Sequence, residues 1–313
     1  MSALTRRTLM AALAASAIGG RACAASVSPA PALIAIERQH GLRIGAVMQA
    51  ANGRVLLSHR ADERFLLCST FKAFLVGAVL DRAEVEPGLL QRRIAMREDR
   101  RVVNSPVTAR QPSGSSLTVE ELCAATIEVS DNTAANCLLD LVGGPAGMTR
   151  VFRRLGDRTS RLDRLEPQLN LGAPGDLRDT TTPAAVAGAL RRMLLGPRLL
   201  GTADRTRVLD WMARERNGTR RIRAGMPAGW TVCNKPGTNY QGAANDIAIV
   251  RDPTGQAFAI AVYVDSPRSD IPANEDVIAQ VARIAALSAA SPELRRASTS
   301  HRQTRTIRRS LIA

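Results

Sequence analysis

The sequence predicts an α+β fold: an antiparallel five-stranded sheet with flanking helices, built from both chain ends, plus an inserted all-α domain. Two observations lead to this prediction. Segments that read as strands lie near both ends of the 313-residue chain, and helical patterns fill its middle. Because 45% of the residues are hydrophobic, the chain can bury a substantial core. A cleft between two such lobes would be a natural catalytic site.

The first two strands are expected at 43–51 and 55–58. Asn52-Gly53 between them is a strong hairpin signal, because these residues accept the backbone angles of a tight turn. From 69 to 82 the pattern becomes helical.

Three further helices are predicted from the residues that cap their first turns. Such side chains satisfy backbone N–H groups that have no partner within the helix. The caps are Thr118, in a capping box with Glu121; Asp131, whose helix extends through 141 and stops at Gly143-Gly144; and Thr182 before Pro183, whose helix ends near 195.

The sheet is completed by later segments. Strands are expected at 230–234, 246–250 and 257–264, the last two linked by a turn at 252–255, and a closing helix runs from about 274 to 289. The expected domains are 1–24, a signal peptide; 25–60 with 213–291, the α/β lobe; 61–212, the all-α lobe with an Ω-type loop at 161–179; and 292–313, a basic, disordered tail.

The N-terminus reads as an export signal. Arg6 and Arg7 precede an apolar run, and Ala22-Cys23-Ala24 offers a small-residue cleavage site. The arginine pair resembles a twin-arginine signal, and an ordinary Sec signal fits equally well. A lipoprotein anchor at Cys23 is the weaker alternative, since the usual leucine is missing three residues earlier. We expect a soluble mature chain from about residue 25, periplasmic or secreted and not inserted in the membrane.

The formal net charge of +15 raises the question of nucleic-acid binding. The arginines are scattered, aromatic residues make up only 3% of the chain, and no basic recognition motif is present. We therefore expect no nucleic-acid partner, and we expect a monomer. Six arginines crowd the last residues, from Arg295 to Arg309, where no apolar periodicity supports a folded element.

Cysteine and histidine usage limits the chemistry. After loss of Cys23, four cysteines remain, and an oxidising compartment permits disulfides that the sequence cannot assign. Their spacing matches no zinc ligand set, so we expect no metal and no cofactor. Because histidines are so few, any serine nucleophile needs a different base. The residues concerned are Cys68, Cys123, Cys137 and Cys233, and His40, His59 and His301.

Only two of the 43 basic residues are lysines, Lys72 and Lys235. Arginine cannot lose its proton at working pH, whereas a buried lysine can. These two positions are therefore candidates for a chemically required amine, with chance or packing as the alternative for either one alone.

Ser69 and Lys72 form an S-x-x-K motif at the start of a predicted helix. Positions i and i+3 share one helix face, so the hydroxyl and the amine can meet. The helix N-terminus adds free N–H groups and positive potential near the serine. A neutral amine could take the hydroxyl proton and make a nucleophile without histidine. Taken alone, the motif is also compatible with an incidental surface pair.

Ser130-Asp131-Asn132 lies at a junction between helices. Capping by Asp131 explains one residue of the three. The functional interpretation gives Ser130 a proton relay to a leaving nitrogen and lets Asn132 bind the substrate amide.

Glu166 and Asn170 lie in the predicted Ω-type loop. A carboxylate and an amide together can hold and activate one water molecule. An exposed loop glutamate is the alternative. Arg164 and Asp179 could form an ion pair that joins the two ends of this loop.

Lys235-Pro236-Gly237 is expected to end a strand. Gly237 would let another molecule approach the backbone, and Lys235 would supply a cation for a carboxylate. A simple Pro-Gly turn is the alternative.

These four elements, in this order, resemble the class A serine β-lactamases, enzymes of antibiotic resistance with a β-lactamase/penicillin-binding-protein-like fold. The resemblance implies a hydrolase in which Ser69 attacks the lactam carbonyl and Glu166, with Asn170, activates the water that frees the acyl-enzyme. The acylation base would be Lys72, or Glu166 through water. Further implied roles are an oxyanion hole from the backbone N–H groups of Ser69 and Thr238, and a carboxylate site from Lys235 with Arg221 or Thr238.

The chain departs from the family pattern at several positions. Pro236 stands where Thr or Ser is usual, which removes a hydroxyl and a backbone N–H. Asn104 and Leu165 replace aromatic residues. Cys68 resembles the carbapenem-hydrolysing members and Cys123 resembles half of another family disulfide, but the partner positions carry Asn239 and Val76.

Two alternatives share part of the motif set. A penicillin-binding peptidase uses the same Ser-x-x-Lys logic but lacks the deacylating loop that Glu166 and Asn170 indicate. A non-enzymatic sensor, or a decayed relative, would acylate and then stall. Pro236 is the best support for that second alternative.

Overall fold

The computed structural model describes residues 30–173, 175–197 and 199–290. The predicted signal, its cleavage site and the basic tail lie outside these described residues. Within them, no helix has the length and apolar character that crossing a membrane requires.

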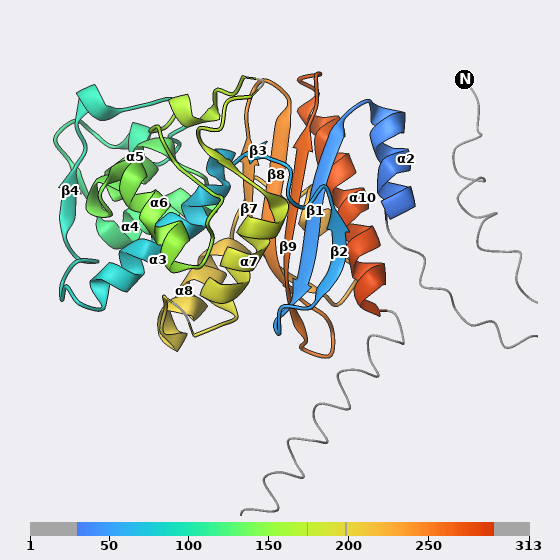
Figure 1. The fold of residues 1–313 in the computed structure, drawn as a ribbon. Helices are drawn as coiled ribbons and strands as arrows, with labels where there is room; N and C mark the ends of the chain where they lie inside the picture. The colour runs from blue at the N-terminus through green and yellow to red at the C-terminus, as the bar shows by residue number, and fades with distance from the viewer. Residues whose placement is uncertain (1–29, 174, 198, 291–313) are drawn as a thin grey trace, which may run out of the picture.

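A five-stranded antiparallel sheet forms one half of the molecule (Figure 1). Its order is β2-β1-β9-β8-β7, so the first strands of the chain pair with the last ones. β1 pairs with β9 over eight residues, from Arg43 opposite Asp265 to Ala50 opposite Phe258. The predicted α+β fold is therefore confirmed. The strands are β1 (Arg43–Ala50), β2 (Val55–His59), β7 (Thr231–Thr238), β8 (Ala243–Arg251) and β9 (Ala257–Asp265).

Both faces of the sheet are buried, and alternate residues of β9 serve two different cores. Phe258 and Ile260 lie in the core beneath α2 (Ala30–His40) and α10 (Ile271–Ala290). Ala259 and Ala261 belong to the core that the sheet shares with α7 (Pro183–Leu194) and the helices beyond it. The sheet is therefore fixed from both sides and offers a rigid support for its edge strand β7.

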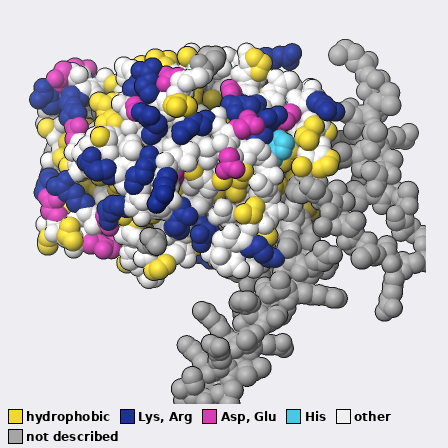
Figure 2. Space-filling view, in the orientation of Figure 1, with side chains coloured by type: hydrophobic (Ala, Val, Ile, Leu, Met, Phe, Trp, Pro, Cys, Tyr) yellow, Lys and Arg dark blue, Asp and Glu magenta, His cyan; other side chains and the backbone are white. Residues whose placement is uncertain are grey.

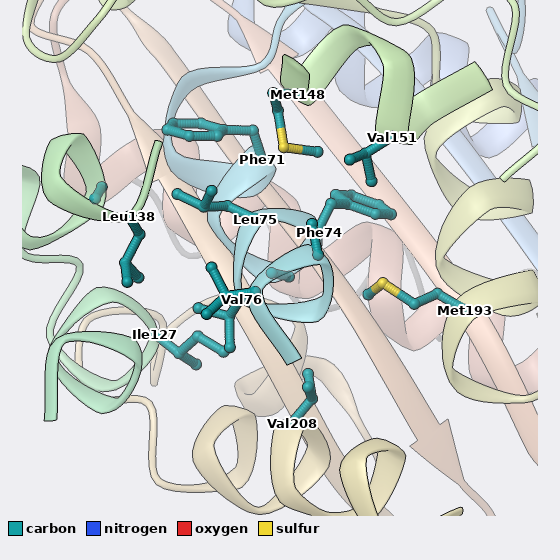
Figure 3. Packing of buried hydrophobic residues seen from close by; sticks show 14 of the residues in the cluster. Phe71, Phe74, Leu75, Val76, Ile127, Leu138, Met148, Val151, Met193 and Val208 are labelled. Carbon is teal, nitrogen blue, oxygen red and sulfur yellow. The ribbon is translucent and has the colours of Figure 1, made fainter. Parts of the chain in front are cut away.

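The helical half is built around α3 (Phe71–Ala83), whose residues 71–80 are all buried. Figure 3 shows its apolar side chains meeting those of the surrounding helices, and Phe74 makes an edge-to-face contact with Phe152 at 5.3 Å between ring centroids. A helix enclosed in this way holds the residues at its N-terminus firmly. The neighbouring helices are α4 (Val119–Glu128), α5 (Asn132–Leu141), α6 (Gly144–Arg154) and α8 (Thr202–Ala213).

The capping predictions are confirmed. The capping box is present at the start of α4, Asp131 accepts from the Ala134 N–H at 2.9 Å, and Thr182 caps α7 with Pro183 at its first turn. The helix predicted from 69 begins two residues later, because Cys68–Thr70 form a 3₁₀ turn that leads into α3.

Strand β7 corrects one prediction. We expected it to end before Lys235, but it continues through Thr238, so the Pro-Gly turn interpretation is wrong. The physical reason is the position of β7 at the edge of the sheet, where a proline can face away from the ladder. Lys235, Pro236 and Gly237 therefore lie within an ordered strand.

Several elements were not predicted. Helices α6 and α8 bury only a few side chains each and carry several arginines, so few apolar residues mark them in the sequence. The two short strand pairs each join segments that lie far apart in the sequence, so no local pattern predicts them. These elements are α2, α6, α8 and α9 (Ile222–Gly225), with β3 (Phe65–Leu66) pairing β6 (Thr180–Thr181) and β4 (Arg93–Ala95) pairing β5 (Ser116–Thr118).

The surface charge is dispersed. Figure 2 shows basic groups scattered over the visible face with acidic groups among them. Both lysines are buried, so these surface groups are arginines. Arg154, for example, pairs with Asp81 at 2.7 Å, and Arg43 pairs with Glu63 at 3.1 Å.

Candidate active site

The amine of Lys72 is the centre of the site. Its side chain is fully buried, and the amine donates to the Asn132 side-chain oxygen at 2.6 Å and to the Ser130 carbonyl at 2.8 Å. Its Nζ lies 3.0 Å from Glu166 Oε1. Lys72 therefore joins three segments that are distant in sequence, in the immediate neighbourhood of Ser69.

Burial lowers the pKa of Lys72 by removing water from the ammonium group, while the nearby Glu166 carboxylate opposes this change. The Oε1 atom of Glu166 also lies 3.5 Å from Ser69 Oγ. A lysine with a lowered pKa and a carboxylate thus both stand beside the same hydroxyl. The carboxylate contacts the hydroxyl directly and Lys72 contacts the carboxylate, so both groups are candidates for receiving its proton.

Ser130 lies at the corner between α4 and α5, in the left-handed backbone region with φ of 59°. Its hydroxyl oxygen accepts from Lys72 Nζ at 3.2 Å and from Lys235 Nζ at 3.1 Å. A hydroxyl held between two amines is well placed to pass a proton. Asp131, by contrast, is buried and holds the loop that contains Thr108, accepting from its N–H at 2.9 Å and its hydroxyl at 2.8 Å.

Glu166 is almost fully buried, with 1% of its surface exposed. Its Oε2 accepts from the Asn170 amide at 2.6 Å. The predicted ion pair at the ends of the loop is confirmed: Arg164 Nε lies 2.5 Å from Asp179 Oδ2, and the Asp179 side chain is completely buried. The loop is therefore anchored at its base and presents Glu166 inward.

Asn136 was missed by the sequence analysis. Its amide donates to the Glu166 carbonyl at 2.9 Å, and its oxygen accepts from the Glu166 N–H at 3.0 Å. It lies one helical turn after Asn132 on α5, which is the signal that could have identified it. Asn136 therefore fixes both backbone polar groups of Glu166, its N–H and its carbonyl.

Lys235 reaches the site from strand β7. Its side chain is fully buried, and its Nζ donates to Ser130 Oγ and, at 3.0 Å, to the Pro236 carbonyl. Burial lowers the pKa of Lys235 to about 7, and the charge of Lys72 adds to this effect, whereas Glu215 and Asp246 oppose it.

Gly237 is needed for a contact within the chain itself. A Cβ atom at this position would lie 3.0 Å from the Ser69 nitrogen and 3.1 Å from the Leu67 carbonyl oxygen. The sequence predicts that this glycine lets another molecule approach the backbone. The structure shows instead that the missing side chain lets the segment with Ser69 pack against β7. The backbone of β7 therefore lies directly against the Ser69 N–H group.

Arg221 is 3% exposed and does not line the cleft. Its guanidinium donates to the Gly237 carbonyl at 2.8 Å and to the Thr238 hydroxyl at 2.6 Å, and its Nε pairs with Glu275 at 3.1 Å. Thr238 does line the cleft. Arg221 thus acts on the cleft through the end of β7.

The cleft between the two halves has a volume of about 800 Å³. At one side of it, the Tyr240 hydroxyl donates to the Asn104 side-chain oxygen at 3.2 Å. Leu165 does not line it. The cleft contains the predicted residues Ser69, Ser130, Asn132, Asn170, Gly237 and Thr238, whereas Lys72, Glu166 and Lys235 lie buried behind its wall.

The four cysteines of the described residues are free. Cys68 is fully buried next to Ser69, and burial raises its pKa far above the usual range of a thiol. Within the described ranges, no group of three or more histidine, cysteine, aspartate or glutamate side chains is arranged to hold a metal ion.

A serine beside a buried amine and a buried carboxylate, without histidine, is an arrangement suited to acyl transfer. The comparisons with known proteins agree with this reading. A sequence model of the β-lactamase enzyme family matches residues 29–288. The chain is 43% identical to β-lactamase L2 of Stenotrophomonas maltophilia over 263 residues, which cover 83% of this chain and 86% of L2.

Two further comparisons extend this result. The chain is 41% identical to the carbapenem-hydrolyzing β-lactamase KPC of Klebsiella oxytoca, over 91% of this chain and 97% of KPC. Its structure resembles that of an ancestral class A β-lactamase with a TM-score of 0.78 and 45% identity, covering 82% of this chain and 97% of the other. The chain therefore belongs to the β-lactamase enzyme family, and within it to class A.

Proposed function

We propose that the chain carries out the reaction of its family, β-lactam hydrolysis, through an acyl-enzyme on Ser69. The observation that carries this proposal is that the Lys72 amine contacts both Ser130 and Glu166, and that Glu166 in turn lies 3.5 Å from the Ser69 hydroxyl. Attack of Ser69 Oγ on the lactam carbonyl forms the acyl bond. The backbone N–H groups of Ser69 and Thr238 would stabilise the oxyanion, each typically by about 3–4 kcal/mol.

In the acylation step, the Ser69 proton passes to neutral Lys72, or through water to Glu166. The C–N bond of the lactam then breaks, and its nitrogen receives a proton through Ser130. The position of Ser130 between two amines supports this relay, because a donated proton can be replaced from Lys72. Overall, Ser69 loses one proton and the lactam nitrogen gains one.

In the deacylation step, Glu166 takes a proton from a water molecule that Asn170 helps to position. The resulting hydroxide attacks the acyl carbonyl, the bond to Ser69 Oγ breaks, and the proton taken by Glu166 passes to the Ser69 oxygen. The 2.6 Å contact between Asn170 and Glu166 supports this assignment, as does the Ω-type loop that buries the carboxylate. A peptidase without such a loop could not clear the intermediate in this way.

We further assign substrate binding to the two walls of the cleft. Asn132 would bind the side-chain amide of the substrate, and β7 would contribute the backbone of Gly237 and Thr238. Lys235, with Thr238 held by Arg221, would receive the carboxylate.

Export is part of the same proposal. Residues 1–24 would direct the chain to the periplasm or the exterior, where it would act as a monomer without a nucleic-acid partner. The Arg6-Arg7 pair and the apolar run after it support export. We also keep the proposed lobe boundaries, 25–60 with 213–291 and 61–212.

Hydrolysis of nitrocefin by the purified mature chain tests the proposal. We expect steady turnover that the Ser69→Ala variant loses. A single burst without turnover would instead support the sensor alternative, for which Pro236 is the main argument. Absence of both a burst and turnover would contradict the proposal.

A further inference from the structure

The carboxylate end of the cleft is short of hydrogen-bond donors. Pro236 offers neither a side-chain hydroxyl nor a backbone N–H. The Thr238 hydroxyl oxygen accepts from Arg221 at 2.6 Å, which leaves one O–H to donate, and two of the three donors of the Lys235 ammonium already go to Ser130 and to the Pro236 carbonyl. Because a carboxylate can accept about four hydrogen bonds, it can use a further donor beside Lys235 and Thr238.

A segment between α8 and α9 lies beside this end. A Cβ atom at Gly218 would stand 2.5 Å from the Asn234 amide nitrogen and 3.1 Å from Pro236 Cγ, so the segment rests directly on β7. The Arg216 N–H donates to the Glu128 carbonyl at 3.0 Å, two residues before Ser130. The residue between these two contacts is Asn217.

Asn217 has a fixed backbone and an available side chain. The buried Glu215 carboxylate accepts from the Asn217 N–H at 2.7 Å and from the Gly218 N–H at 2.8 Å. The Asn217 side chain is exposed and the residue lines the same cleft as Ser130, Pro236 and Thr238. Within the part of the chain that the structure describes, its side-chain amide makes no hydrogen bond. A fixed backbone with a free donor is what a binding residue requires.

We propose that Asn217 is a specificity residue of this cleft, and that its side-chain amide donates a hydrogen bond to the substrate carboxylate in place of the hydroxyl that Pro236 lacks. This inference rests on the proposed function and names the residue that completes its carboxylate site. The two positions are coupled, because the Pro236 ring lies against the Gly218 backbone next to Asn217. The amide does not titrate, so its contribution is independent of pH.

The test compares two substrates that differ in one group, benzylpenicillin and its methyl ester. We expect Asn217→Ala to raise KM for the acid by about tenfold, the size of one hydrogen bond to a charged group, with little change in kcat. The ester should respond much less. Thr219→Ala is the matched control, since Thr219 is exposed in the same segment but does not line the cleft. Its kinetics should not change.

A double variant separates a loss of binding from a loss of folding, because a misfolded protein would not regain activity. Adding Pro236→Thr to Asn217→Ala should restore binding of the acid, because the hydroxyl returns from the neighbouring strand. An unchanged KM for the acid, or an equal loss for acid and ester, would overturn the inference. Turnover by the wild-type chain tests the proposed function separately, so a failure confined to the Asn217 variants leaves that function standing.

Discussion

The two walls of the cleft differ in how closely they follow the pattern of the family. On the helical wall, Lys72 and Glu166 are buried and have several partners: Lys72 contacts Ser130, Asn132 and Glu166, and Glu166 is held by Asn136. On the sheet wall, Pro236 removes two polar groups, and Arg221 is occupied by the protein itself. The chemistry is therefore constrained by packing, whereas substrate binding is more open to substitution.

The largest expected effect lies on the helical wall. Glu166→Ala removes the base for deacylation, so we expect kcat to fall by about 10²–10⁴-fold, with an acylation burst that remains. Stopped-flow measurement with nitrocefin separates the burst from the steady rate. Glu63→Ala, a half-buried carboxylate that does not line the cleft, is the control. Normal turnover by the Glu166 variant would contradict the assigned role.

A smaller effect is expected from Asn136→Ala, which acts through the backbone of Glu166. The variant leaves the buried Glu166 N–H without a partner, at a cost of about 1–3 kcal/mol in the free energy of unfolding. Because the carboxylate would shift, deacylation should slow more than acylation, by up to about 10²-fold. Denaturant unfolding and single-turnover kinetics measure the two effects. Equal slowing of both steps would argue against a positioning role.

The sheet wall should respond to pH. Because the pKa of Lys235 is lowered to about 7, its positive charge is present below that value and is lost as the pH rises above it. Each further pH unit reduces the charged fraction about tenfold, so kcat/KM for benzylpenicillin should decline above pH 7. The methyl ester provides the reference. If acid and ester declined together, the titration would belong to the catalytic groups and not to carboxylate binding.

The smallest effect is expected from Pro236→Thr in the wild-type chain. Since Asn217 already supplies a donor in our account, we expect a gain in kcat/KM of only about threefold, well below the value of a full hydrogen bond to a charge. Steady-state kinetics with benzylpenicillin measure it. If kcat/KM did not rise, the missing hydroxyl would not limit substrate binding. A gain far above tenfold would show that Asn217 does not replace that hydroxyl.

Local signals were sufficient for much of the fold. Capping residues such as Thr118 and Asp131 act within one turn of their own helix, and the Asn52-Gly53 turn sets the first hairpin. The extension of β7 through Pro236 could not be predicted, because it depends on the strand lying at the edge of the sheet. The short β3–β6 and β4–β5 pairs likewise depend on contacts between distant segments.

The residues of the site also divide into those that a local sequence pattern predicts and those that depend on contacts between distant segments. The order of the four motifs was enough to predict Ser69, Lys72 and Glu166 as site residues, because each motif combines residue types that this chemistry requires. Asn136 and Asn217 were missed: the helical spacing from Asn132 was a signal for Asn136 but not for its contact with the Glu166 backbone, and Asn217 lies in none of the four motifs. The contacts of these two residues become visible only when the chain is folded.

The central claim is that Ser69 becomes acylated and that Glu166 frees it. Intact-mass measurement with benzylpenicillin, followed by peptide mapping, tests it most directly. Our account predicts a transient adduct on Ser69 in the wild-type chain, a persistent one in Glu166→Ala and none in Ser69→Ala. An adduct on another residue, or no adduct in the Glu166 variant, would contradict it.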